Sequence, residues 1–185
     1  MARPREFDTD IVTDRALNLF WREGYQRTSL ADLEHETGVR RKGLYNTFGS
    51  KHGLFLEALK RYEERSIELV LAPLESAGAG RAEIAHVFET LTFQVGPAHG
   101  NRGCLVCLTA ESEVARTEEV AKRLQEYLER LRNGLAGALP RGLAAGHIAA
   151  DKDPEVLADF LGRHGDGFVR DGSRRPASDT DNALR

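Results

Sequence analysis

The stretch from Thr28 to Phe48 reads Thr-Ser-Leu-Ala-Asp-Leu-Glu-His-Glu-Thr-Gly-Val-Arg-Arg-Lys-Gly-Leu-Tyr-Asn-Thr-Phe and carries the strongest fold signal in the chain. Ser29 and Asp32 form a capping box that starts a short helix, and residues 37–39 make a tight turn around a glycine. Three consecutive cations, residues 40–42, open a second short helix. Two small helices joined by a short glycine-bearing turn, the second of them basic, are typical of a helix-turn-helix that binds DNA.

The segments on either side of this stretch complete a three-helix head. Before it, Asp8 or Thr9 can cap a helix whose apolar residues recur every three or four positions, and Gly24 is placed to end that helix. After it, a long helix is expected over about residues 51–72. The head therefore leads directly into a longer helical segment.

Apolar spacing predicts more helices over about residues 81–95, 103–113 and 118–139, with a last helix beginning after Asp153. Pro140 and the glycines behind it are expected to loosen the chain that follows the third of these. Strand-like alternation is absent. The predicted fold is all-α: a three-helix helix-turn-helix head and a helical C-terminal body, with its last helices truncated or disordered.

Composition limits the classes of function. The chain has 185 residues, of which 41% are hydrophobic, and a net charge of −3. Residues 1–51 carry nine Lys/Arg and eight Asp/Glu, so nucleic-acid binding must come from a local patch and not from the overall field. No run of about 18 apolar residues predicts a membrane helix, and the first residues lack the apolar core of a signal peptide. We therefore expect a cytoplasmic protein with reduced cysteines.

The sequence gives little support to an enzyme. No nucleophile–base set, carboxylate pair or phosphate loop stands out, although turnover of a compound by the purified body would revive that interpretation. The histidines are scattered, without zinc-type spacing, at His35, His52, His86, His99, His147 and His164. We expect neither a cofactor nor a metal.

One continuous pattern over residues 10–60 closely resembles the DNA-binding head of the tetracycline-repressor (TetR) family. The residues that carry it are Ala16-Leu17-Asn18-Leu19-Phe20, Gly24-Tyr25, Thr28-Ser29-Leu30, Thr37-Gly38-Val39, Leu44-Tyr45, Phe48-Gly49-Ser50-Lys51, Leu54 and Ala58-Leu59. The resemblance implies a homodimeric transcriptional regulator, usually a repressor. It also implies a body that binds a small effector of unknown identity and a dimer interface built from the last two long helices.

The third helix is the recognition helix that the resemblance implies. Arg40 and Arg41 can donate two hydrogen bonds each to guanine, and Lys42 suits a phosphate or guanine. Phosphate positioning without base readout is an equal alternative for each of these cations. The full set expected at DNA is Thr28, Ser29, Arg40, Arg41, Lys42, Gly43, Tyr45, Asn46 and Lys51.

Two positions depart from the family pattern. The family usually has Gly, Pro or Ala where Lys42 stands, and Ser or Thr where Gly43 stands. A hydroxyl that could bind phosphate is therefore missing at Gly43, and a glycine inside so short a helix costs about 1 kcal/mol relative to alanine. We infer an operator preference that cannot be copied from relatives.

The family places its effector pocket among body helices, and here the expected lining is Phe88, Leu91, Cys104, Leu108 and Tyr127. Plain hydrophobic core is the alternative for each residue. Cys104 and Cys107 are three residues apart on a predicted helix and are candidate redox or electrophile sensors. Arg102 and the helix N-terminus at Gly103 are expected to lower the pKa of Cys104. A buried cysteine acting as a small apolar residue is the alternative.

The predicted division is a head over residues 1–50, a ligand-binding and dimerisation body over residues 51–161, and an aberrant or disordered tail over residues 162–185. Only three residues of that tail are large and apolar, too few to offset the entropy of ordering it. A slipped reading frame near Gly162 is one hypothesis, and natural divergence is the other. Either leaves the usual dimer interface incomplete, so a degenerate regulator that dimerises poorly is the runner-up function.

Overall fold

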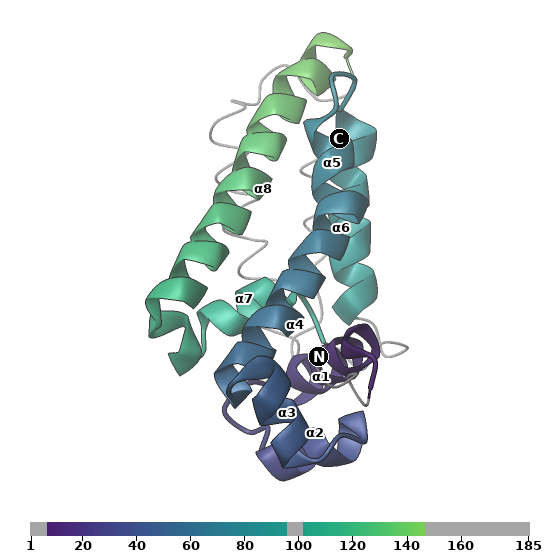
Figure 1. Ribbon diagram of the computed structural model, residues 1–185. Helices are drawn as coiled ribbons and strands as arrows, with labels where there is room; N and C mark the ends of the chain where they lie inside the picture. Colours follow the sequence, from purple (N-terminus) through teal and green to yellow (C-terminus); the bar gives the residue numbers. More distant parts are fainter. Residues whose placement is uncertain (1–6, 96–101, 147–185) are drawn as a thin grey trace, which may run out of the picture.

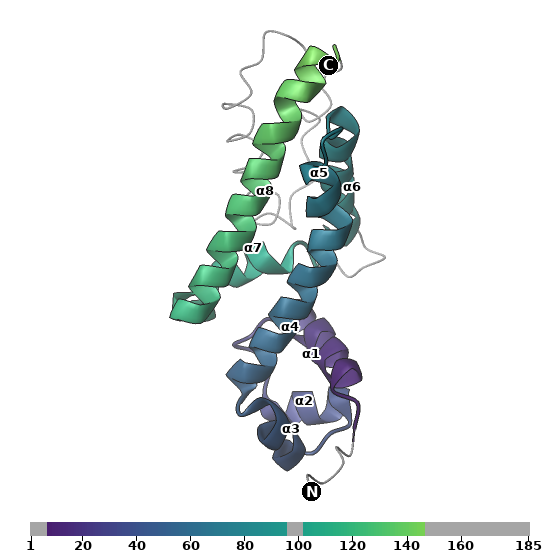
Figure 2. The same ribbon diagram turned by 45° about the horizontal axis from the view of Figure 1, so that its top comes forward.

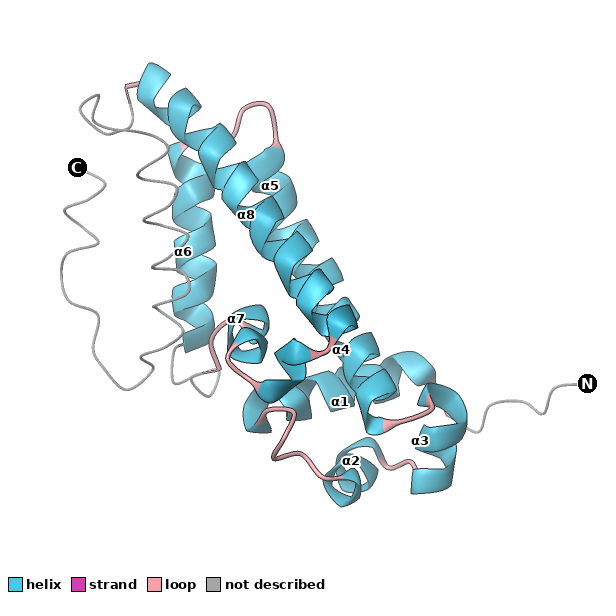
Figure 3. Ribbon diagram, turned by 90° about the vertical axis from the view of Figure 1, so that its left-hand side faces the viewer, coloured by secondary structure: helices cyan, strands magenta, loops and turns pink. Residues whose placement is uncertain are grey.

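The computed structural model describes residues 7–95 and 102–146, with the backbone alone for residues 91–95. All elements within these ranges are helices, as Figure 3 shows. The described helices include none long and apolar enough to cross a membrane. The helix expected after Asp153, the tail over residues 162–185 and the dimer-forming helices implied by the resemblance lie outside the described residues.

Three helices form the head at one end of the molecule: α1 (Thr9–Glu23), α2 (Leu30–Thr37) and α3 (Arg41–Phe48) (Figure 1). Helix α4 (Lys51–Ser66) packs along α1 and runs from the head into the body. The shared core is apolar and almost fully buried, and its members include Val12, Ala16, Leu17, Phe20, Leu33, Leu44, Leu54, Phe55 and Ala58. Burial of this face holds α1–α3 together, because helices of 8 to 15 residues have little stability alone.

The helix ends in the head follow the local sequence signals. The Asp8 carboxylate caps α1 by accepting from the Asp10 amide at 2.8 Å. Gly24 ends α1 with a φ of 80°, a backbone conformation that L side chains rarely adopt. The predicted capping box is confirmed, since the Ser29 hydroxyl accepts from the Asp32 amide while the Asp32 carboxylate accepts from the Ser29 amide.

The prediction of a single long helix over residues 51–72 is wrong at its C-terminal end. Helix α4 stops at Ser66, a π-helical turn η1 (Ile67–Leu71) follows, and a short α5 (Ala72–Glu75) completes the segment. Pro73 has no N–H, so it cannot bond the carbonyl four residues before it, that of Leu69. The His86 ring lies 3.0 Å from that carbonyl oxygen, which can only accept, so Nε2–H donates to it.

The body continues with α6 (Arg81–Val95), α7 (Leu105–Ala110), a 3-10 turn η3 (Glu113–Arg116) and α8 (Glu118–Ala144). Figures 1 and 2 show α7 between α4 and α8 at the head end of the body. The expected single helix over residues 103–113 is therefore shorter than predicted. A turn closed by the Ser112 hydroxyl, which donates to the Thr109 carbonyl at 2.7 Å, interrupts it.

Helix α8 also corrects the prediction at Pro140, because the helix passes through that residue and continues to Ala144. Packing on α5 and the neighbouring turn overrides the local signal. A Cβ on Gly134 would lie 2.8 Å from Leu74 Cδ2, so the two helices approach as closely as a glycine permits. Arg130 of α8 also pairs with Glu75 of α5.

Candidate nucleic-acid interface

Helix α3 buries one face and exposes the other. Val39 in the turn and Leu44 in α3 are buried and fix the helix on the head. The opposite face exposes Arg40, Arg41, Lys42, Tyr45 and Asn46. Among the described residues, no carboxylate lies within ion-pair distance of the three cations. The structure therefore brings five of the nine predicted DNA residues to one exposed basic face, which we call the α3 face.

The start of α3 is capped by a residue that the sequence interpretation missed. Arg40 occupies the N-cap position but makes no side-chain cap hydrogen bond. The Glu34 carboxylate of α2 accepts from the Arg41 amide at 2.5 Å and satisfies one orphan donor of α3. The Arg41 guanidinium carbon lies 5.9 Å from the centre of the Tyr45 ring. This cap comes from a residue seven positions earlier, which no local capping pattern includes.

Close packing around residue 43 explains why a glycine stands there. A Cβ built at this position would lie 2.9 Å from Val39 Cγ1 and 3.2 Å from Phe7 Cε1. Phe7 precedes α1 in the chain, so this residue packs against α3 at the position where the resemblance predicts Ser or Thr. A serine or threonine at residue 43 would require both neighbours to shift.

The residues at the start of α2 differ in what they can offer to DNA. Thr28 is buried, and both its amide and its hydroxyl donate to the Gly24 carbonyl, so its placement does not support the expected contact with DNA. Ser29 is exposed, but its hydroxyl donates to Asp32 at 2.6 Å within the capping box.

Lys51, the first residue of α4, is partly buried against an aromatic ring. The Lys51 ammonium lies 4.3 Å from the centre of the Tyr25 ring, and partial burial lowers the pKa of Lys51.

A buried polar cluster lies inside the body where α4, α7 and α8 meet. The Tyr62 hydroxyl donates to Cys104 Sγ at 3.4 Å, and the Ser66 and Tyr127 hydroxyls are 2.5 Å apart. The Cys107 thiol and the Tyr62 hydroxyl favour the Cys104 thiolate, outweigh burial, and lower the pKa of Cys104 to about 7. Burial raises the pKa of both Tyr62 and Tyr127, which keeps the phenols neutral.

Arg102 was expected to lower the pKa of Cys104, but in the structure its guanidinium interacts with α1. The Arg102 guanidinium donates to the Asn18 side chain at 3.0 Å and lies 5.7 Å from the centre of the Trp21 ring. Cys104 itself is the N-cap residue of α7, and Cys107 lies within that helix. The helix N-terminus still acts on the thiol, because the backbone N–H groups of Val106 and Cys107 also lower its pKa.

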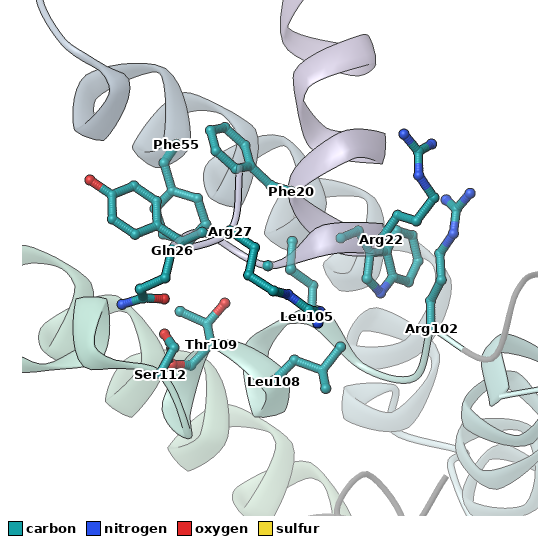
Figure 4. A pocket seen from close by; sticks show the side chains of 13 residues that line it. Phe20, Arg22, Gln26, Arg27, Phe55, Arg102, Leu105, Leu108, Thr109 and Ser112 are labelled. Carbon is teal, nitrogen blue, oxygen red and sulfur yellow. Dashed lines mark hydrogen bonds between the residues drawn. The ribbon is translucent and has the colours of Figure 1, made fainter. Parts of the chain in front are cut away.

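The predicted effector residues fall in different places. Cys104 and Tyr127 belong to the buried cluster, Phe88 is half-buried on α6, and the side chain of Leu91 lies outside the described residues. Leu108 lines a cavity of about 320 Å³ between head and body, which we call the joint cavity (Figure 4). Its lining is Phe20, Trp21, Arg22, Gly24, Tyr25, Gln26, Arg27, Phe55, Arg102, Leu105, Leu108, Thr109 and Ser112.

The effector pocket thus stays a prediction, and sequence reasoning did not find the joint cavity. Its walls come from residues 20–27, Phe55 and residues 102–112, which are far apart along the chain and carry no shared motif. Across the described parts of the chain, no group of three or more His, Cys, Asp or Glu residues is arranged to hold a metal ion.

Comparison with known proteins gives a consistent picture. Residues 12–58 match the family described as bacterial regulatory proteins, tetR family, and residues 81–171 match the tetracyclin repressor-like C-terminal domain. The chain is 33% identical over 173 residues to the HTH-type transcriptional repressor ComR of Escherichia coli strain K12, covering 86% of this chain and 76% of ComR. It is 31% identical over 162 residues to the HTH-type transcriptional regulator YezE of Bacillus subtilis strain 168, covering 87% and 84%.

Solved structures agree with these matches. The fold is similar to that of CifR, a TetR family transcriptional regulator solved as a cysteine mutant with a 26-bp double-strand operator DNA. The two share 32% identity with a TM-score of 0.79, over 100% of this chain and 98% of CifR. A transcriptional regulator from Saccharomonospora viridis, solved with choline, has a TM-score of 0.76 at 21% identity over 95% and 90% of the chains, a likeness of fold alone.

Proposed function

The chain belongs to the TetR family of bacterial regulatory proteins, and on that premise we propose that it is a repressor which releases its DNA operator when a small effector binds the body. The observation that carries this proposal is the α3 face. Its three cations have no carboxylate partner among the described residues, so no ion pair must break before they contact DNA. Operator DNA bound to CifR, at 32% identity, supports the same use of this head.

We further propose that the operator is bound by a homodimer, through heads over residues 1–50 and bodies over residues 51–161. Two copies of a recognition helix read half-sites about one helical turn, roughly 34 Å, apart. Each half-site adds phosphate contacts as well as base contacts, which strengthens binding and makes it sensitive to salt.

Selection of bound duplexes from a random DNA library tests the operator, and sedimentation of the full chain at micromolar concentration tests the dimer. We expect the enriched sequences to be palindromic, with half-sites spaced by one turn, and the sedimenting species to be a dimer. A monomer that enriches only weak, unpaired half-sites would favour the degenerate regulator instead. Absence of any enriched sequence would contradict both versions of the proposal.

A thiol-responsive repressor is a second candidate, and the lowered pKa of Cys104 favours it. A thiolate is the nucleophilic form of cysteine, so a thiol with a pKa of about 7 is substantially reactive at neutral pH. Burial of Cys104 acts against this candidate, because an electrophile must reach a side chain that is only 3% exposed. The lowered pKa of Cys104 therefore favours thiol sensing, whereas its burial disfavours it.

Alkylation of Cys104 by iodoacetamide is expected to accelerate as the pH rises through about 7 and to level off above it. This pH dependence follows from the lowered pKa, because the folded protein favours the thiolate of Cys104. The alkylation rate of a thiol with the ordinary pKa of 9.0 would instead continue to rise up to about pH 9. Peptide mass spectrometry distinguishes Cys104 from Cys107, and Cys104→Ser gives the Cys107 background. A midpoint near pH 9, or no labelling of native protein, would remove this candidate.

A further inference from the structure

We propose that the joint cavity binds a small organic anion, a carboxylate attached to an aromatic or similarly apolar group. This site lies between head and body and is separate from the buried cluster around Cys104. Its volume of about 320 Å³ is at the lower end of the range for small-molecule sites. The inference goes beyond the proposed function, because binding of such an anion does not require operator recognition.

Charge is the first argument for an anion. Three arginines line the joint cavity and no aspartate or glutamate does, in a chain whose net charge is −3. Arg22 is partly neutralised, because its guanidinium pairs with Glu23 at 3.0 Å and with Glu36 at 3.2 Å. The electrostatic attraction for an anion therefore rests mainly on Arg27 and Arg102.

Arg27 is held in a position to receive a carboxylate. Its Nε donates to the Glu23 carbonyl at 2.6 Å, and this bond anchors the side chain. The two terminal nitrogens make no hydrogen bond or ion pair within residues 7–95 and 102–146. Figure 4 shows the Arg27 side chain reaching toward Leu105. A guanidinium with its two terminal nitrogens available can donate two parallel hydrogen bonds to one carboxylate.

Arg102 supplies a second positive charge at the cavity wall. Its Nε is buried and has no hydrogen-bond partner in the described part of the chain, while its terminal nitrogen donates to Asn18. A buried N–H without a partner is costly, and an anion nearby reduces that cost. In Figure 4 the guanidinium groups of Arg22 and Arg102 lie together at one edge of the site.

The apolar part of the ligand has matching walls. Phe20, Phe55 and Leu105 are at most 3% exposed, and they meet around the cavity with half-buried Leu108. Phe20 and Phe55 hold each other edge to face at a ring-centre distance of 5.2 Å. A fixed apolar surface beside a few convergent donors is the usual composition of a small-molecule site.

The position of the joint cavity couples it to the head. The Trp21 indole N–H of α1 donates to the Gly103 carbonyl at 2.8 Å, directly before α7. On the other side, the Gln26 side chain lies against the start of η3, and with its amide rotated by 180° its oxygen accepts from the amides of Glu113 and Val114, both at 3.2 Å. A ligand between these contacts touches both head and body. If ligand binding changes the orientation of the head, it changes the affinity for the operator, and operator binding changes the affinity for the ligand by the same factor.

Trp21 is the single tryptophan of the chain and lines the site, so its fluorescence reports occupancy in the full-length protein. The probe is phenylacetate, and phenylacetamide is its uncharged match. We expect a saturable fluorescence change with phenylacetate, with a Kd between micromolar and about 1 mM, and a much weaker one with phenylacetamide. Calorimetry on the same samples gives an affinity that does not depend on the indole.

Two substitutions and one control complete the test. Arg27→Gln and Arg102→Gln are each expected to weaken phenylacetate binding about tenfold or more, because each removes a charged donor. Arg81→Gln also removes one positive charge, but from the exposed start of α6, and is expected to leave the affinity unchanged. Leu108→Phe should reduce binding by filling the cavity.

Three results would overturn the proposal. Equal affinity for phenylacetate and phenylacetamide would mean that the site recognises the ring and not the charge. No saturable signal by fluorescence or calorimetry would mean that the cavity does not bind this class. An equal loss of affinity in Arg27→Gln and Arg81→Gln would mean that overall charge, and not this site, attracts the probe. None of these results depends on whether the head binds its operator.

Discussion

Alanine at Arg41 is expected to weaken operator binding by about 1–3 kcal/mol, which corresponds to roughly five- to more than hundredfold in affinity. The expectation rests on position: Arg41 is exposed in the first turn of α3, the part of a recognition helix that reaches base edges. Its amide is already bonded to Glu34, which fixes the backbone from which the side chain extends. A guanidinium there can donate two hydrogen bonds to guanine O6 and N7.

The measurement compares binding of Arg41→Ala to the selected operator and to unrelated duplexes over a series of salt concentrations. Base readout predicts a loss on the operator and little loss elsewhere. A uniform loss on all sequences, with a salt slope reduced by about one, would make Arg41 a phosphate contact. Lys122→Ala is the matched control, because this exposed lysine of α8 pairs with Glu126 on the body. An unchanged operator affinity in Arg41→Ala would contradict both roles.

The head could be predicted from the sequence because its signals are local. Asp8, the Ser29–Asp32 box and Gly24 act within three or four residues of the bonds that they complete, and the structure places these ends of α1 and α2 accordingly. The recognition helix followed from the same kind of pattern. What could not be read locally is why a glycine stands at residue 43, since part of the reason is Phe7, a residue outside the motif.

The body shows the opposite case, because contacts between distant residues decide its helix ends. Pro73 and Pro140 carry the same local breaking signal, yet one follows a π-helical turn and the other lies inside α8. The difference comes from partners such as His86 and the close packing at Gly134, which no spacing rule contains. The joint cavity is hidden for the same reason, since its walls meet only once the head is folded against α7.

Alanine at Phe55 is expected to lower the free energy of unfolding by about 3–5 kcal/mol. Phe55 is 1% exposed on α4 and contacts two rings of the head. Its ring centre lies 5.2 Å from that of Phe20 and 4.9 Å from that of Tyr25. Truncation would remove both aromatic contacts and leave a hole next to the joint cavity, where the surrounding helices cannot collapse without moving the head.

Urea unfolding of the full chain measures this effect with two probes, Trp21 fluorescence for the head and circular dichroism for all helices. Leu69→Ala is the control, because that side chain is 62% exposed on the π-helical turn and its loss should change stability by less than about 0.5 kcal/mol. Since Phe55 joins head and body, we expect both probes to shift together. A shift confined to Trp21 fluorescence would show that the head unfolds by itself, and a loss below about 1 kcal/mol would contradict the core role assigned to Phe55.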